Sequence, residues 1–104
     1  MAFTATTVVA SPAQADTPGC VTLSEYQTVY RHYTMARVAD HFDTGGSYVD
    51  GYYWSNGDQY VVRSYRKCRS FDGGRGHVGV SFDNYTAQNA GYYDGRMRLY
   101  DKWP

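Results

Sequence analysis

The chain has 104 residues, with ten acidic and ten basic side chains and a formal net charge of zero, so its overall charge does not point to a nucleic acid partner. Its two cysteines lack the paired spacing of zinc ligands, and we expect neither a metal nor a cofactor. Aromatic residues make up 17% of the chain and include twelve tyrosines, so any account of function depends on where these rings lie.

The first residues are typical of a shortened signal peptide. Residues 1–15 carry no charge, Phe3–Ala10 is a modestly apolar run, and Ala13-Gln14-Ala15 has the small-x-small pattern of a cleavage site. The basic segment that normally precedes such a run is missing, and the alternative is a disordered Ala/Thr tail. The run is too short to span a bilayer. We therefore expect a signal-peptide remnant, followed by one secreted domain over residues 16–104.

The two cysteines, Cys20 and Cys68, are expected to form a disulfide. An even number of cysteines in a small secreted domain indicates pairing, because the extracellular environment is oxidising. A domain of this size has little capacity for a core that stabilises it unaided. In the chain-entropy model, closing the loop between these two residues stabilises the fold by about 4 kcal/mol.

Two short helices are predicted near the start of the domain. Thr22-Leu23-Ser24-Glu25 has the form of a capping box, which predicts a helix over residues 23–31. Thr34 begins a second pattern, in which Met35, Val38, Ala39 and Phe42 form an apolar stripe at helical spacing. Gly45-Gly46 follows this stripe and predicts the end of a helix over residues 35–42.

The period then changes to two, which predicts four antiparallel strands. They are expected at residues 48–54 and 59–68, around Val78, Val80 and Phe82, and at residues 96–103. Asn56-Gly57, between the first two strands, favours a tight type I′ hairpin turn. The expected fold class is α+β, with two short N-terminal helices packed on one face of a four-stranded antiparallel sheet. The other face is left open to water.

The aromatic residues of the first strand divide between its two faces. Tyr48, Asp50, Tyr52 and Trp54 alternate with Val49, Gly51 and Tyr53. A buried face does not readily accept an unpartnered carboxylate, so the face with Asp50 is expected to be open. Val49 and Tyr53 are then expected to serve the core.

The other strands are assigned to faces by the same alternation. Cys68 is expected to face the helices in order to reach Cys20. This directs Tyr60, Val62, Ser64 and Arg66 inward, and it places Val61, Arg63, Tyr65 and Lys67 on the open face. Arg98 and Tyr100 are expected outward, opposite Met97 and Leu99. Tyr, Trp and Arg are enriched at protein-binding hot spots, which makes this face a candidate contact surface. The alternative is that half of its rings pack only against one another.

No catalytic motif surrounds the three histidines, His32, His41 and His77. A small secreted ribonuclease would need a base, an acid and a cation around one phosphate, but the only glutamate, Glu25, is expected to cap a helix. His77 beside Arg63 or Arg66 on neighbouring strands is the pairing that such a site could use, but no catalytic motif surrounds these residues. We expect the protein not to be an enzyme, and a ribonuclease-like hydrolase is the weakest alternative.

The charges are unevenly distributed along the chain. Up to Val62 there are six acidic residues and two arginines, whereas from Arg63 onward there are eight basic and four acidic residues. A dipolar domain of this kind can steer its encounter with a charged partner. The alternative is ordinary surface charge that keeps the protein soluble.

Several short motifs resemble the secreted β-lactamase inhibitory protein family. Thr22-Leu23-Ser24-Glu25-Tyr26 and Tyr33-Thr34-Met35-Ala36-Arg37-Val38 are similar to the two helix starts of its repeat. Thr44-Gly45-Gly46-Ser47-Tyr48, Gly57-Asp58-Gln59-Tyr60 and the Asp94-Gly95 to Trp103 strand are similar to later segments. These islands span most of residues 22–103, and this chain has one repeat where the family has two.

The resemblance implies a helix pair on a four-stranded sheet whose concave face grips a protein partner, such as a secreted enzyme. Carried over by position, Tyr48, Asp58 and Trp103 would contribute to that grip. Strict alternation, however, places Trp103 on the same face as Met97, away from that role. Residues 84–93 are expected to be an insertion relative to the family.

The sequence therefore predicts a secreted, non-catalytic protein-binding module or inhibitor without a membrane span. The alternative is a module that binds carbohydrate or cell wall, because exposed aromatic rings also stack on sugars. The predicted partner-binding residues are Tyr48, Asp50, Tyr52, Trp54, Asp58, Arg63, Tyr65, Arg98, Tyr100 and Trp103.

Overall fold

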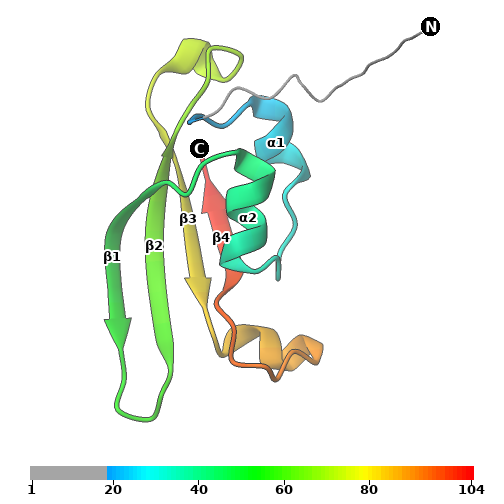
Figure 1. The fold of residues 1–104 in the computed structure, drawn as a ribbon, viewed down its shortest axis with the longest axis vertical. Coiled ribbons are helices and arrows are strands. Elements are labelled where there is room, and N and C mark those ends of the chain that lie inside the picture. The colour runs from blue at the N-terminus through cyan, green and yellow to red at the C-terminus, as the bar shows by residue number, and fades with distance from the viewer. Residues whose placement is uncertain (1–18) are drawn as a thin grey trace, which may run out of the picture.

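The computed structural model describes residues 19–104, and the predicted signal-peptide remnant lies outside them. Helices α1 (Leu23–Thr28) and α2 (Met35–Phe42) precede four strands, β1 (Ser47–Tyr53), β2 (Gln59–Arg66), β3 (His77–Asp83) and β4 (Arg98–Trp103). Each strand pairs antiparallel with the next, in the order β1-β2-β3-β4 (Figure 1). The predicted α+β fold class is confirmed. Within residues 19–104, no helix has both the length and the apolar character that crossing a membrane requires.

Both helices begin where the sequence predicts. The Thr22 amide donates to the Glu25 carboxylate at 2.9 Å and the Glu25 amide donates to the Thr22 hydroxyl at 3.1 Å, which completes the capping box. The Thr34 hydroxyl accepts from the Arg37 amide at 3.2 Å. Helix α1 ends at Thr28 rather than at residue 31, because Val29 adopts an extended conformation and is buried in the core.

The turn between β1 and β2 differs from the predicted type I′ turn. Gly57 has a φ of 94°, but Asn56 does not share the positive φ that a type I′ turn needs at both central residues. The Gly57 amide donates to the Trp54 carbonyl, and the Trp54 amide donates to the Asp58 carbonyl. These bonds are typical of a longer loop in which a single left-handed glycine precedes the second strand.

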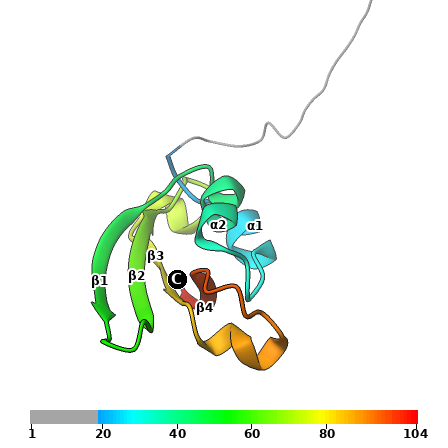
Figure 2. The same cartoon turned by 60° about the horizontal axis from the view of Figure 1, so that its bottom comes forward.

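The core lies between the two helices and one face of the sheet (Figure 2). Val38 and Phe42 of α2 pack with side chains of β2, β3 and β4. The residues that each strand contributes to this core are alternate residues that project from the same face of the sheet. The buried sheet residues of this cluster are Val61, Tyr65, Val78, Val80, Phe82 and Leu99. The prediction that the helices cover one face is confirmed.

The face assignment of β2 was wrong. Tyr65 is 1% exposed, and its ring meets Phe42 edge-on with the centroids 5.0 Å apart, so it faces the helices. Tyr65 pairs with Val78 and Val61 pairs with Phe82, and directly paired residues lie on one face of a sheet. Tyr60 therefore points to the open face. The prediction failed because Cys68 lies beyond the end of β2, where alternation no longer holds.

A bulge in β1 corrects a second assignment. Tyr48 pairs with Arg63 and Asp50 pairs with Val62, so Val49 is an extra residue in the strand. Asp50 and Tyr52 lie on the open face as predicted, whereas Tyr48 lies on the face of Gly51, whose Cβ position would be 3.2 Å from the Tyr48 hydroxyl. Val49 is 57% exposed and Tyr53 is 70% exposed, so neither serves the core.

A bulge in β4 reverses the faces of the sheet to which the last residues of this strand point. Leu99 pairs with Phe82 and Asp101 pairs with Ser81, so Tyr100 is the extra residue. Trp103 consequently lies over Gly79, where an added Cβ would come within 2.3 Å of the indole. Strict alternation had placed it on the Met97 face, and the bulge reverses this.

The same bulge turns Lys102 toward the helices. Its ammonium group donates to the carbonyls of Tyr26 and Val29 and lies 4.5 Å from the Tyr26 ring centroid. A cation at this position satisfies free carbonyl groups at the end of α1. Burial lowers the pKa of Lys102. The sequence pattern alone does not indicate this contact of Lys102.

We predict that Tyr65→Phe unfolds with nearly unchanged free energy at pH 7, because its buried hydroxyl has no hydrogen-bond partner in the described chain. Burial raises the pKa of Tyr65 to about 12. The unfolded tyrosine ionises at lower pH, so wild-type stability should fall as pH rises from about 10 to 12, by up to about 3 kcal/mol relative to the variant. Urea unfolding at pH 7 and pH 11 measures this. Equal losses in both proteins would contradict it.

The predicted Cys20–Cys68 disulfide is present and closes a segment with a sequence separation of 48. Replacing both cysteines by alanine should lower the free energy of unfolding by about 4 kcal/mol, because the unfolded chain gains the entropy that the crosslink removes. Denaturant unfolding of the oxidised protein and the variant measures this difference. A loss below about 1 kcal/mol would show that the crosslink contributes little.

Candidate binding surface

The open side of the sheet carries a cluster of aromatic side chains around Trp54. The Trp54 ring lies 4.8 Å from that of Tyr52, 5.8 Å from that of Tyr60 and 6.0 Å from that of Tyr85, measured between centroids. Tyr100 lines the same shallow pocket as Trp54, Tyr60 and Tyr85. We call these five residues the aromatic face: Tyr52, Trp54, Tyr60, Tyr85 and Tyr100.

Strand pairing explains why these rings meet. Tyr52 pairs with Tyr60, and Tyr60 pairs with Asp83, so their side chains project from the same face of three neighbouring strands. Trp54 follows β1 directly and packs between them. Tyr52 is 57% exposed, Trp54 38% and Tyr100 44%, so this packing leaves much of each ring in contact with solvent.

Asp83 positions Tyr85 at the end of β3. The carboxylate of Asp83 accepts from the amides of Tyr85 and Thr86 at 3.2 and 2.8 Å and from the Thr86 hydroxyl at 2.7 Å. These bonds fix the start of the short 3₁₀ helix η4 (Thr86–Ala90), whose N-cap residue is Tyr85. Partial burial and the negative charge of Asp83 raise the pKa of the Tyr85 hydroxyl. At neutral pH it is a hydrogen-bond donor.

Asn84 ties the β1–β2 turn to this corner. Its side-chain oxygen accepts from the Gln59 amide at 2.8 Å, and its side-chain nitrogen donates to the Gly57 carbonyl at 3.0 Å. The Asn84 amide also donates to the Gln59 carbonyl at 3.2 Å. The turn that carries Trp54 is thus held against the end of β3.

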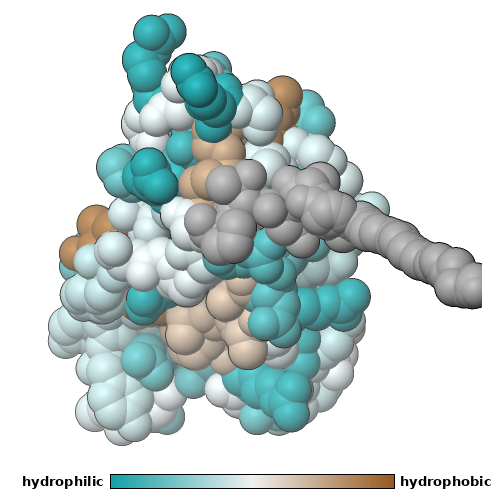
Figure 3. Space-filling view, turned by 45° about the horizontal axis from the view of Figure 1, so that its top comes forward, coloured by the Kyte–Doolittle hydropathy of each residue, from teal (hydrophilic) through white to brown (hydrophobic). Residues whose placement is uncertain are grey.

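The pocket at the aromatic face is shallow and of mixed polarity. It has a volume of about 400 Å³, and Ser81, Asp83 and Thr86 contribute polar atoms beside the rings. The exposed rings are mostly tyrosines, which combine apolar area with a hydroxyl group. On the side of the molecule that Figure 3 draws, strongly hydrophobic residues form only small, separate patches.

Five of the predicted contact residues share the open side of the sheet. They are Asp50, Tyr52, Trp54, Tyr100 and Trp103. The Tyr60 hydroxyl lies 3.5 Å from the Asp50 carboxylate, which links the acidic residue to the aromatic face. Trp103 is 42% exposed and lies over Gly79, near the start of β3. Tyr60 pairs with Asp83 at the end of β3, so the two side chains are far apart along the strand.

The other predicted contact residues lie elsewhere. Tyr48 is on the opposite side of the sheet, and Asp58 lies in the turn, where it accepts from the Asn56 side chain at 3.2 Å. Arg63 donates to the carbonyls of Gly45 and Gly46 at 2.8 and 3.2 Å. These contacts place Arg63 on the side of the helices.

Tyr65 and Arg98 do not contribute to the aromatic face, and for different reasons. Tyr65 is in the core. Arg98 pairs with Asp83 and so starts on the open side of the sheet, as predicted. Arg98 donates to the His32 carbonyl at 2.8 Å and to the Asp94 carboxylate at 2.7 Å, so its guanidinium group lies against the connection between the helices. Neither residue joins the aromatic face.

Sequence reasoning missed Tyr60 and Tyr85. Tyr60 was predicted to point toward the helices, because the residues of β2 were assigned to the wrong faces of the sheet. Tyr85 falls in the segment read as an insertion, although Asp83 followed three residues later by Thr86 resembles a helix start and could have indicated an ordered turn.

The three histidines occupy separate places in the structure. The His41 ring lies 2.9 Å from the Thr28 hydroxyl and 3.1 Å from the Glu25 carbonyl, and it joins the two helices. His77 pairs with Arg66 at the start of β3. His32 has a φ of 74° in the connection between the helices. Within residues 19–104, no three His, Cys, Asp or Glu side chains gather as metal ligands.

Comparison with protein-family models, with curated proteins and with solved structures found no match.

We predict that Asn84→Ala loosens the β1–β2 turn. The change removes two side-chain hydrogen bonds to the turn and should lower the free energy of unfolding by about 1–3 kcal/mol. The Gln59 amide, which donates to Asn84, should exchange its hydrogen faster in the variant. Asn89→Ala, at an exposed position on η4, is the matched control. Unchanged exchange at Gln59 would contradict the role given to Asn84.

Proposed function

We propose that this chain is a secreted, non-catalytic protein-binding module or enzyme inhibitor that contacts its protein partner through the aromatic face. The observation that supports this most is the clustering of Tyr52, Trp54, Tyr60, Tyr85 and Tyr100 on the sheet side that the helices leave uncovered. Tyrosine and tryptophan are enriched at hot spots because they add large contact area at little cost in conformational entropy.

The shape of the molecule supports the same proposal. The lower part of the β1–β2 hairpin extends beyond both helices, so its two sides are accessible (Figure 1). Asn84 holds this hairpin in place through the Gly57 carbonyl and the Gln59 amide. A contact surface that is ordered before binding loses less entropy when the partner arrives.

The disulfide supports an extracellular location. Bonds such as Cys20–Cys68 form and persist in oxidising compartments and are rare in a reducing cytosol. The crosslink joins the segment before α1 to the segment after β2, and it stabilises a domain whose core is small.

The resemblance to the β-lactamase inhibitory protein family remains a proposal with partial geometric support. The helix pair on a four-stranded sheet agrees with the fold that the resemblance implies. The bulge in β4 brings Trp103 to the open side, as the carried-over role requires. Tyr48 lies on the other side of the sheet, so three matched residues do not form one surface. A secreted enzyme is the class of partner that we propose.

The test compares three forms of the protein in affinity capture from extracellular proteins. We expect wild type and the control Tyr93→Ala, which alters a 77% exposed ring outside the aromatic face, to capture the same partner. The double variant Tyr52→Ala/Trp54→Ala should bind the purified partner at least about 30-fold more weakly, because the loss of even one hot-spot residue costs about 2 kcal/mol or more.

Stability and alternative ligands complete the test. The double variant should lose no more than about 2 kcal/mol of unfolding free energy, since Tyr52 is 57% and Trp54 38% exposed and the two rings meet edge-to-face outside the core. A larger loss would make the rings part of the core. Retention of wild type by purified cell-wall polysaccharide, without any protein partner, would favour the carbohydrate alternative. RNA cleavage that His77→Ala abolishes would overturn a non-catalytic function.

A further inference from the structure

Four arginines line a cleft at the edge of β4 that faces away from β3. The proposed function does not use this cleft. The cleft has a volume of about 350 Å³ and lies between the connection of the two helices and the segment that leads into β4. We call it the arginine cleft, after Arg31, Arg37, Arg96 and Arg98. We propose that it binds a phosphate or sulfate group, a role that goes beyond the proposed protein contact.

Backbone hydrogen bonds hold the walls of the cleft together. The His32 amide donates to the Leu99 carbonyl at 2.9 Å, and the Leu99 amide donates to the Tyr33 carbonyl at 2.8 Å. The Met35 amide donates to the Met97 carbonyl at 2.9 Å. The connection between the helices therefore runs along β4 as a paired segment, and the arginines on each side are carried by ordered backbone.

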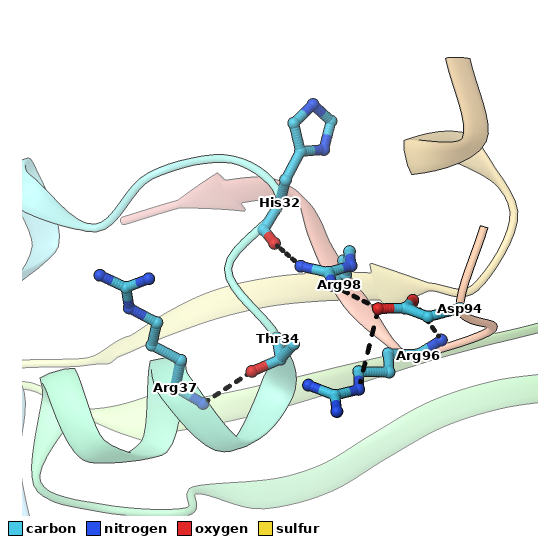
Figure 4. Close-up of polar contacts among 6 residues, drawn as sticks. All are labelled: His32, Thr34, Arg37, Asp94, Arg96 and Arg98. Atoms are coloured by element: carbon cyan, nitrogen blue, oxygen red, sulfur yellow. Dashed lines mark hydrogen bonds and ion pairs between the residues drawn. The ribbon is translucent and has the colours of Figure 1, made fainter. Parts of the chain in front are cut away.

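Arg98 forms the buried part of the cleft. Its side chain is 12% exposed, and its guanidinium lies 4.1 Å from the Tyr92 ring centroid. It donates to the His32 carbonyl and to Asp94, as Figure 4 shows. The hydrogen bond from Arg98 lowers the pKa of the Asp94 carboxyl, so Asp94 is ionised at neutral pH and compensates one of the four positive charges.

The guanidinium groups of Arg37 and Arg96 remain available to bind a ligand. The Arg37 guanidinium lies 4.1 Å from the Tyr33 ring centroid and has no hydrogen-bond acceptor within residues 19–104. The Arg96 side chain is 69% exposed and lies 3.8 Å from Asp94, beyond hydrogen-bond length. Arg37 extends from α2 and Arg96 from the segment before β4, on either side of Thr34, and the two side chains do not contact each other (Figure 4). Each guanidinium group retains N–H donors for an anion bound in the cleft.

The charge balance favours an anion with several acceptor oxygens. Four arginines line the cleft, and none of the acidic side chains in the described part of the chain lines it. Helix α2 begins beside the cleft at Thr34 and directs the positive end of its dipole there. The guanidinium fork matches the oxygens of phosphate and sulfate, and a tetrahedral anion can accept from more than one arginine at once.

The cleft adjoins the aromatic face through one contact. Arg31 donates from its Nε to the Tyr100 carbonyl at 3.1 Å, and its guanidinium lies 5.4 Å from the Tyr100 ring centroid. Arg31 lines the cleft and Tyr100 lines the aromatic pocket, so the two sites are neighbours across β4.

The full chain is titrated with inorganic phosphate, with inorganic sulfate and with the monoester phosphoserine, and calorimetry measures the binding of each. We expect dissociation constants on the order of millimolar for at least one of them, as suits a small anion at an open site. Tighter binding of phosphoserine would identify an esterified group as the ligand, and equal binding would identify the free anion. Chloride, added as sodium chloride at the same ionic strength, should displace the bound anion less than phosphate or sulfate does.

Two double variants separate the cleft from net charge. Arg37→Gln/Arg96→Gln should bind about tenfold more weakly, the loss expected from one charge-assisted hydrogen bond. Arg69→Gln/Arg75→Gln removes the same charge at exposed positions outside the cleft and should leave the affinity unchanged. An equal loss in both variants, or no binding by wild type, would overturn the proposal.

A spectroscopic measurement on wild type keeps the test independent of how the variants fold. The Nε–Hε resonances of Arg37 and Arg96 should shift during the phosphate titration, and those of Arg69 and Arg75 should not. Shifts confined to Arg69 and Arg75 would contradict the cleft. This outcome does not depend on whether a protein partner binds the aromatic face.

Discussion

The edge-to-face contact between Tyr65 and Phe42 determines which side of the sheet the helices cover. The two rings are buried with their centroids 5.0 Å apart, one on β2 and the other on α2. Side chains in a strand alternate between faces, so Tyr65 in the core places Val61 there as well and turns Tyr60 outward. The aromatic face follows from this contact, because Tyr60 is then available to Trp54.

Two bulges then change the alternation at the outer strands. The extra residue in β1 separates Tyr48 from Asp50 and Tyr52, and the extra residue in β4 separates Trp103 from Leu99. A bulge shifts every later side chain of its strand to the other face. The open side consequently gains Trp103 and loses Tyr48. Lys102 moves to the helix side, where it satisfies carbonyl groups of α1.

Strand β4 connects the two proposed binding sites. Tyr100, the bulged residue, lines the aromatic pocket, and Arg98 at the start of the strand forms the base of the arginine cleft. The connection between the helices pairs with β4 and carries Arg31 to Tyr100. A ligand in the cleft and a partner on the aromatic face would therefore contact the same strand from its two sides.

The sequence by itself determined the elements of this protein. Capping residues such as Thr22 and Glu25, the apolar stripe of α2 and the period-two segments act within a few residues of each other, so the helices and the four strands followed from local patterns. Asp50, Tyr52 and Trp54 were placed correctly for the same reason. The disulfide followed from the presence of only two cysteines. Only the tertiary structure decided the parity of β2, the two bulges and the meeting of four arginines from separate segments, because these depend on long-range packing and on strand register. A single extra residue reverses a face, and nothing in the sequence around Val49 or Tyr100 marks that residue.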